Sequence, residues 1–127
     1  MSTFVRRVLL LDAATCAGMG LALALLAAPL EPWLGLPAEV LLYAGIALLP
    51  IAAFMAWVAS RERVPAAGVW LVILGNAAWV LGSLALFLAV SPTALGYAFV
   101  IAQALVVVAL AEMEYVGLRK AAETNFA

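Results

Sequence analysis

The sequence predicts an all-α membrane protein, a four-transmembrane-helix up-down bundle with both termini cytoplasmic. The 127 residues are 69% hydrophobic and 10% charged, whereas soluble domains carry roughly 25% charged residues. No charged residue lies between Arg63 and Glu112. The basic residues form three clusters separated by apolar stretches: Arg6 and Arg7, Arg61 and Arg63, Arg119 and Lys120. Because each pair of crossings returns the chain to the side it left, all of them fall on one face, which the positive-inside rule identifies as cytoplasmic.

The apolar stretches are each long enough for the roughly 20 helical residues that cross a bilayer. The first helix is expected to end before Pro29, where an outer loop without basic residues runs to Pro37. The second helix begins there and ends at Ser60, before the arginines of the loop that follows. The chain is therefore predicted to form a single domain over 1–127, with helices at 5–28, 37–60, 65–90 and 92–117.

A short turn, Ser91-Pro92-Thr93, separates the third helix from the fourth. Proline suits the first turn of a helix and serine suits its cap, so this sequence predicts a tight connection. The amino-terminal run has a second interpretation, a cleaved signal peptide, because basic residues precede an apolar stretch that ends in alanines. Asp12 interrupts that stretch and Pro29 would follow the cut, and both features favour the membrane helix.

Small residues indicate how the helices pack, because helices in lipid associate by close contact of small side chains. The third helix has a seven-residue repeat of such residues: Gly68, Gly75, Gly82 and Ala89. The first helix has small residues at four-residue spacings, and Cys16 is interpreted as one of them. We expect the glycine repeat of the third helix to lie against another helix, in the first instance the first.

Four polar or amphipathic residues near the middle of the membrane are candidates for a pocket: Asn76, Trp79, Ser83 and Gln103. A buried amide in hydrocarbon needs hydrogen-bond partners. In one interpretation Asn76 and Gln103 form hydrogen bonds across the third and fourth helices and hold them together. In the other, these residues border a pocket for a ligand headgroup or a transported solute.

Three acidic residues lie closer to the cytoplasmic side, namely Asp12, Glu112 and Glu114. Helical geometry places Glu114 on the same face as Gln103, directed inward, and turns Glu112 away. Acids inside a membrane are functional candidates by default. Their shallow depth also allows ion pairs with Arg7, Arg61, Arg63 or Arg119, and we expect such structural pairs, with a proton-coupling role as the alternative.

The composition argues against an enzyme. Histidine is absent and Cys16 is the single cysteine, so the commonest metal ligand and general base are missing. No nucleophile elbow, zinc-protease or phosphate-loop motif occurs. We therefore expect no catalytic residues, no metal and no cofactor, and the clustered basic residues are explained by topology and not by nucleic acid.

Three stretches of the chain resemble uncharacterised small four-span inner-membrane proteins of bacteria: Asn76-Ala-Ala-Trp79-Val-Leu-Gly-Ser83, Thr93-Ala-Leu-Gly96 and Glu112-Met-Glu114-Tyr-Val-Gly-Leu118. This resemblance implies no activity. The chain is also similar in length and number of spans to the small multidrug resistance transporters. Those proteins use a glutamate in the first helix, where this chain has Asp12, and their glycine and aromatic patterns are not present here.

Two functional hypotheses follow. The first is a non-catalytic accessory subunit, or a module that binds lipid or a small ligand, in a bacterial inner membrane. Its partners would be membrane lipids and either further copies of itself or a larger membrane complex. The alternative is a small oligomeric proton-coupled transporter that uses Asp12 or Glu114.

Overall fold

Four helices make up the computed structural model, which describes residues 3–126 and the side chains of residues 3–120. Each of the four is long and apolar enough to cross a membrane. The predicted all-helical class with four candidate spans is therefore confirmed. The helices are α1 (Thr3–Leu34), α2 (Ala38–Ser60), α3 (Ala66–Ala89) and α4 (Ala94–Phe126).

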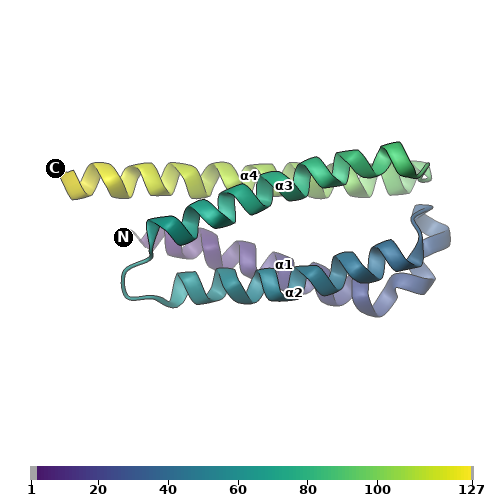
Figure 1. Ribbon diagram of the computed structural model, residues 1–127, viewed down its shortest axis with the longest axis horizontal. Coiled ribbons are helices and arrows are strands. Elements are labelled where there is room, and N and C mark those ends of the chain that lie inside the picture. Colours follow the sequence, from purple (N-terminus) through teal and green to yellow (C-terminus); the bar gives the residue numbers. More distant parts are fainter. Residues whose placement is uncertain (1–2, 127) are drawn as a thin grey trace.

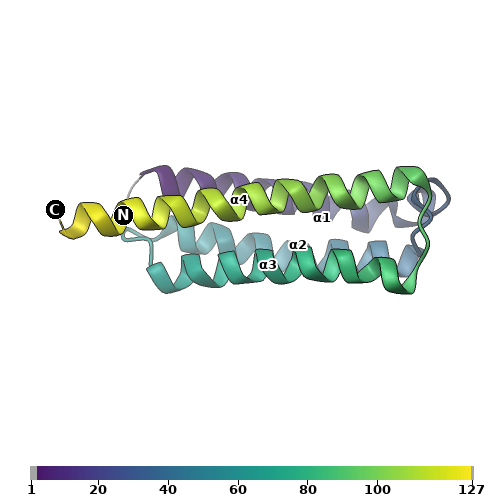
Figure 2. The ribbon, with the colours of Figure 1, turned by 90° about the horizontal axis from the view of Figure 1, so that it is seen from above.

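The helices run alternately in opposite directions and form two hairpins, α1–α2 and α3–α4 (Figures 1 and 2). Helix α1 packs along α2, α3 packs along α4, and α1 also contacts α4. Helices α2 and α3 make few contacts; Gly68 meets Val58 beside their connecting loop, and the two helices then diverge (Figure 1). The bundle is therefore closed along three of its four sides and open along the fourth.

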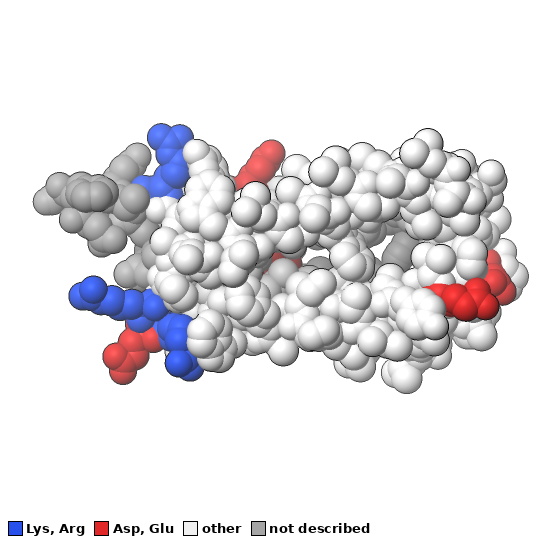
Figure 3. Space-filling view, in the orientation of Figure 1, with Lys and Arg blue, Asp and Glu red and all other residues white. Residues whose placement is uncertain are grey.

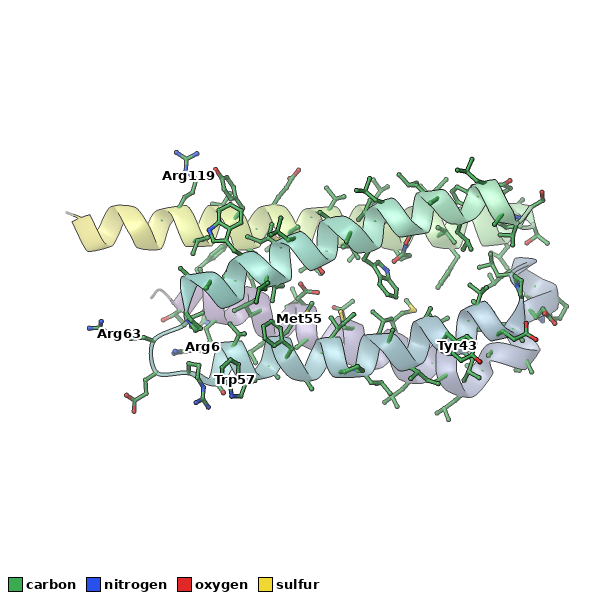
Figure 4. All side chains as sticks on the ribbon, in the orientation of Figure 1. Arg6, Tyr43, Met55, Trp57, Arg63 and Arg119 are labelled. Atoms are coloured by element: carbon green, nitrogen blue, oxygen red, sulfur yellow. The ribbon has the colours of Figure 1, made fainter. Side chains whose placement is uncertain are left out.

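The two ends of the molecule differ in charge. The basic side chains gather at one end of the space-filling view (Figure 3), which we call the arginine end. Figure 4 shows Arg6, Arg63 and Arg119 together at this end and Tyr43 near the other. The other end carries the α1–α2 and α3–α4 connections, and we call it the turn end. Helix α1 begins and helix α4 ends at the arginine end (Figure 1).

Helices α1 and α2 approach each other through glycines. A Cβ atom placed on Gly45 would lie 2.6 Å from the backbone N of Ala24 and 2.6 Å from the backbone O of Gly20. No side chain fits at that distance, so glycine is what allows the two backbones to meet. The small residues of the first helix do make a close contact, and their partner is α2.

The predicted packing of the third-helix glycines is wrong for two of its members. A Cβ atom on Gly75 or Gly82 would meet nothing within 4 Å. Of the three glycines, Gly68 alone meets another helix, and that helix is α2, at Val58, and not the expected first helix. The reason is that α3 diverges from α2 and offers α4 a different face. Gly75 and Gly82 therefore lie along the open side of the bundle.

Two helices are longer than the sequence predicts. Helix α1 continues through Pro29 and Pro32 to Leu34, where a loop was expected. It ends at Gly35, whose φ of +68° is the left-handed conformation that terminates helices. The Gly35 amide donates to the Glu31 carbonyl at 2.8 Å, and the Glu31 side chain accepts a bond from the Ala38 amide at 2.8 Å. Helix α4 likewise continues past Gly117 and the basic residues that were expected to end it.

Thr93 joins the two connections at the turn end. Its hydroxyl oxygen accepts a bond from the Gly96 amide at 3.1 Å, which caps α4. The same hydroxyl donates to the Trp33 carbonyl at 2.7 Å, and the Thr93 amide donates to the Leu34 carbonyl at 3.1 Å. The cap was expected from a serine in this turn, and the structure assigns it to the threonine.

Candidate functional site

Polar side chains from three helices meet inside the bundle. Asp12 comes from α1, Asn76 from α3 and Glu114 from α4. The Asn76 amide nitrogen donates to Asp12 Oδ2 at 2.9 Å and to Glu114 Oε1 at 3.0 Å. We call these three residues the acid cluster. It connects both hairpins, because α1 belongs to one and α3 and α4 to the other.

The acid cluster is buried. Asp12 is 1% exposed, Asn76 6% and Glu114 0%. The Oε2 atom of Glu114 is buried and has no hydrogen-bond partner. A buried polar atom without a partner is unusual and costs about 1–3 kcal/mol, more when the group is charged. This oxygen is therefore the feature of the cluster that most needs a chemical explanation.

No arginine compensates the two acids. Among the residues with described side chains, no Lys or Arg nitrogen lies within 4.0 Å of either carboxyl group. Arg6 donates instead to the backbone carbonyls of Ala59, Arg61 and Glu62. The expected ion pairs of Asp12 and Glu114 are thus replaced by hydrogen bonds to one neutral amide. The distances between the carboxyl groups and the arginines depend on how the helices are shifted along one another and on burial. Residue spacing along the sequence predicts neither.

The side chains of Glu112 and Glu114 point in the directions that helical geometry predicts. Glu114 is fully buried while Glu112, two residues earlier, is exposed. Glu112 lies at the edge of an open hollow between α3 and α4, next to Ala111 and Tyr115. It contributes nothing to the acid cluster.

Cys16 also belongs to the surroundings of the acid cluster. Its thiol donates to Asp12 Oδ1 at 3.6 Å. From the sequence, Cys16 was expected to be a small packing residue only. The four-residue spacing from Asp12 places the two side chains on one face of α1, and that spacing is the signal that could have identified the contact.

The other pocket candidates form a second network. The Trp79 indole donates to Gln103 Oε1 at 3.0 Å, and Gln103 Nε2 donates to the Ser83 hydroxyl at 3.0 Å. The Ser83 hydroxyl in turn donates to the Trp79 carbonyl at 2.8 Å. We call Trp79, Ser83 and Gln103 the amide network. It holds α3 to α4 as expected, and Asn76 also bonds across these two helices, with Glu114 of α4 as its partner.

A cavity of about 300 Å³ lies on the open side of the bundle, between α2 and α3. Its α2 wall includes Pro50, Phe54 and Met55, and its α3 wall includes Gly75 and Asn76. Both cluster bonds of Asn76 use its amide nitrogen. Its amide oxygen takes part in neither bond, and Asn76 lines both this cavity and the open hollow between α3 and α4.

The chemistry available to the site is limited. Among the described residues, no group of three or more His, Cys, Asp and Glu side chains is placed to hold a metal ion. Two carboxyl groups on one amide can bind and release a proton. No protein-family model, curated protein or solved structure matches the chain.

Proposed function

We propose that this chain is a multi-pass protein of a bacterial inner membrane, with both termini cytoplasmic, that works as a small oligomeric proton-coupled transporter. One observation carries the proposal. The acid cluster holds two buried carboxyl groups on a single amide, with one carboxyl oxygen left without a partner. An ion pair that served only packing would place a cation beside these acids, and none of the side chains in residues 3–120 does so.

Electrostatics explains why such a cluster binds a proton. Two carboxylates in a poorly hydrated site repel each other and lose their hydration, so the doubly charged state is strongly disfavoured. One proton shared between Asp12 and Glu114 would remove half of the charge and supply the donor that Glu114 Oε2 lacks. Its release would leave two like charges between α1 and α4. Protonation would thereby be coupled to the packing of the two hairpins, as proton-coupled transport requires.

Infrared spectroscopy of the protein in lipid vesicles tests the proton site. We expect the C=O band of a protonated carboxyl group that shifts in deuterated water. Glu114→Gln should remove this band and Asp12→Asn should shift or remove it, whereas the exposed Glu112→Gln is the matched control and should leave it unchanged. The absence of any protonated carboxyl band from mildly acidic to mildly alkaline pH would contradict the proposal.

A second function, binding of lipid or a small apolar ligand as an accessory module, is favoured by the cavity between α2 and α3. Native mass spectrometry of the protein in mild detergent tests it. Gly75→Trp would place an indole at the cavity wall and should reduce bound lipid. Gly18→Trp is the control, because Gly18 also has open space around it but lies on α1 away from this cavity. Equal lipid retention by both variants would contradict this second function.

A further inference from the structure

The cavity of about 300 Å³ between α2 and α3 has a buried wall and an exposed rim. Met55 and Val72 belong to the wall and are buried. Three further lining residues form the rim: Ile51 is 36% exposed, Phe54 37% and Leu71 59%. Apolar cavities of about 150 Å³ stay dry and take up small hydrocarbons. A mostly apolar cavity of the larger volume, with its rim toward the membrane, therefore suits a segment of acyl chain.

A row of side chains on α2 leads from this cavity to the arginine end. Phe54, at the rim, stacks on Trp57 with 6.3 Å between the ring centroids. The guanidinium carbon of Arg61 lies 4.9 Å from the centre of the Trp57 ring. Figure 4 shows Trp57 between Met55 and the arginine end of the helix. Seven residues of helix rise place Arg61 about 10 Å beyond Phe54, on the side where the headgroup of a lipid lies above its chains.

The Arg61 side chain has donors that the protein does not use. An arginine carries five N–H donors, and of the Arg61 nitrogens Nη2 bonds to the Ser60 hydroxyl at 3.3 Å. Among the residues with described side chains, no acid forms an ion pair with Arg61, although Glu62 is next to it in sequence. The carbonyls at the end of α2 are occupied by Arg6 instead. The charge of Arg61 is therefore available to an anion from outside the described protein.

We propose that the cavity between α2 and α3 holds an acyl chain of an anionic phospholipid, whose phosphate binds Arg61 beside the Trp57 ring. This inference rests on the second proposed function, binding of lipid at this cavity, and names the class of lipid and the site of its headgroup. The lipid belongs to the leaflet at the arginine end.

Charge selects an anionic lipid over a zwitterionic one. Arg63 is also exposed and, within residues 3–120, has no ion-pair partner, so two arginines near the headgroup are uncompensated. Phosphatidylglycerol brings them a phosphate alone, whereas phosphatidylcholine brings its own cation as well. Basic residues next to a membrane-spanning helix attract anionic lipids for this reason. An uncharged apolar ligand would use the cavity and leave Arg61 without a partner.

Native mass spectrometry of the full chain in mild detergent tests the headgroup site. Phosphatidylglycerol and phosphatidylcholine with the same acyl chains are added at equal concentration. We expect the wild type to retain phosphatidylglycerol about two- to fivefold better, the range for one exposed ion pair. Arg61→Gln should abolish this preference. Arg119→Gln is the matched control, because it removes the same charge from the same end, beside Tyr115 of α4, and should keep the preference (Figure 4). Equal loss in both variants would overturn the site, since the charge of the whole end would then suffice.

Two further measurements test the position of the acyl chain. Gly75→Trp at the cavity wall should lower the retention of both lipids, whereas Gly18→Trp on α1 should not. Undiminished phosphatidylglycerol in Gly75→Trp would overturn the placement of the chain. Glycerol 3-phosphate supplies the phosphate without acyl chains and should not displace phosphatidylglycerol at equal concentration. Full displacement would show a site for anions alone and would contradict the proposal.

The inference and the function on which it rests can fail separately. Equal retention of the two lipids, lowered by Gly75→Trp and unchanged by Arg61→Gln, would refute the anionic headgroup site and leave lipid binding at the cavity standing. Retention that is the same in the wild type and in all the variants would refute both.

Discussion

Asn76 is the residue on which the interior polar structure depends. Its single amide group donates to carboxyl groups on two other helices, so one side chain positions α1, α3 and α4 relative to one another. Hydrogen bonds to charged or strongly polar acceptors contribute roughly 1.5–3 kcal/mol, whereas buried acceptors that lose their donor carry the full cost of desolvation. Asn76 therefore stabilises the protein mainly because, without it, the buried carboxyl oxygens of Asp12 and Glu114 would have no hydrogen-bond donor.

Asn76→Leu should destabilise the protein, because it removes the donor of two buried carboxyl oxygens at similar side-chain volume. The expected loss is about 1–3 kcal/mol for each oxygen that finds no new partner. Denaturant unfolding in mixed micelles, followed by helical circular dichroism, measures it. Glu112→Gln is the surface control, with an expected change within about 0.5 kcal/mol. Equal stability of wild type and Asn76→Leu would show that the cluster repacks without its amide.

Thr93 makes a comparable connection at the turn end, where its hydroxyl caps α4 and reaches the α1 backbone at Trp33. Thr93→Val keeps the shape of the side chain and removes both bonds. We expect a loss of about 0.5–2 kcal/mol, the range for removal of a helix cap. Ser91→Ala, two residues earlier, is the control in the same unfolding assay. A larger loss of unfolding free energy for Ser91→Ala than for Thr93→Val would show that Ser91, and not Thr93, caps α4.

At the scale of helices, two glycines that both lie in apolar segments differ in their packing. Gly45 lies where the backbones of α1 and α2 are closest, and Gly75 lies on the open side of α3. Both would be interpreted as packing positions from spacing alone. Which glycine packs depends on the rotation of each helix about its axis, and that rotation is set by the neighbour it meets.

Gly45→Leu should separate α1 from α2, because even its Cβ atom would overlap the backbone of α1. Overpacking of this kind costs about 1–3 kcal/mol or more. Gly75→Leu, the matched substitution, should leave the stability of the monomer nearly unchanged. Thermal unfolding in detergent at low protein concentration compares the two variants. Greater damage from Gly75→Leu than from Gly45→Leu would contradict the helix arrangement.

The whole molecule is polarised. Its basic side chains lie at one end (Figures 3 and 4), and the α1–α2 and α3–α4 connections, joined by the hydrogen bonds of Thr93, lie at the other. Inserted in a membrane, this arrangement predicts cytoplasmic termini by the positive-inside rule. The long open side between α2 and α3 is then presented to lipid or to another subunit.

Cysteine labelling in whole cells tests the orientation, in a Cys16→Ala background. Glu39→Cys at the turn end should react with an impermeant maleimide in intact cells, whereas Glu62→Cys should react only after lysis. The physical reason is the positive-inside rule, which predicts that the arginine end, where Glu62 lies, stays in the cytoplasm during insertion. Reaction of Glu62→Cys in intact cells would invert the topology and with it the assignment of both ends.

The sequence by itself determined the four apolar helices, their approximate starts and the inward facing of Glu114. These features depend on composition and on periodicity over one segment at a time, because a span needs about 20 apolar residues and a helix repeats every 3.6. The tertiary structure alone decided that Asp12, Asn76 and Glu114 meet, that Gln103 pairs with Trp79 and Ser83, and that Gly75 faces open space. Those outcomes depend on the stagger, rotation and choice of neighbour between helices. In an apolar chain all faces of a helix are similarly hydrophobic, so hydrophobicity does not determine which face contacts a neighbour. Close packing of small residues and hydrogen bonds between polar side chains determine it.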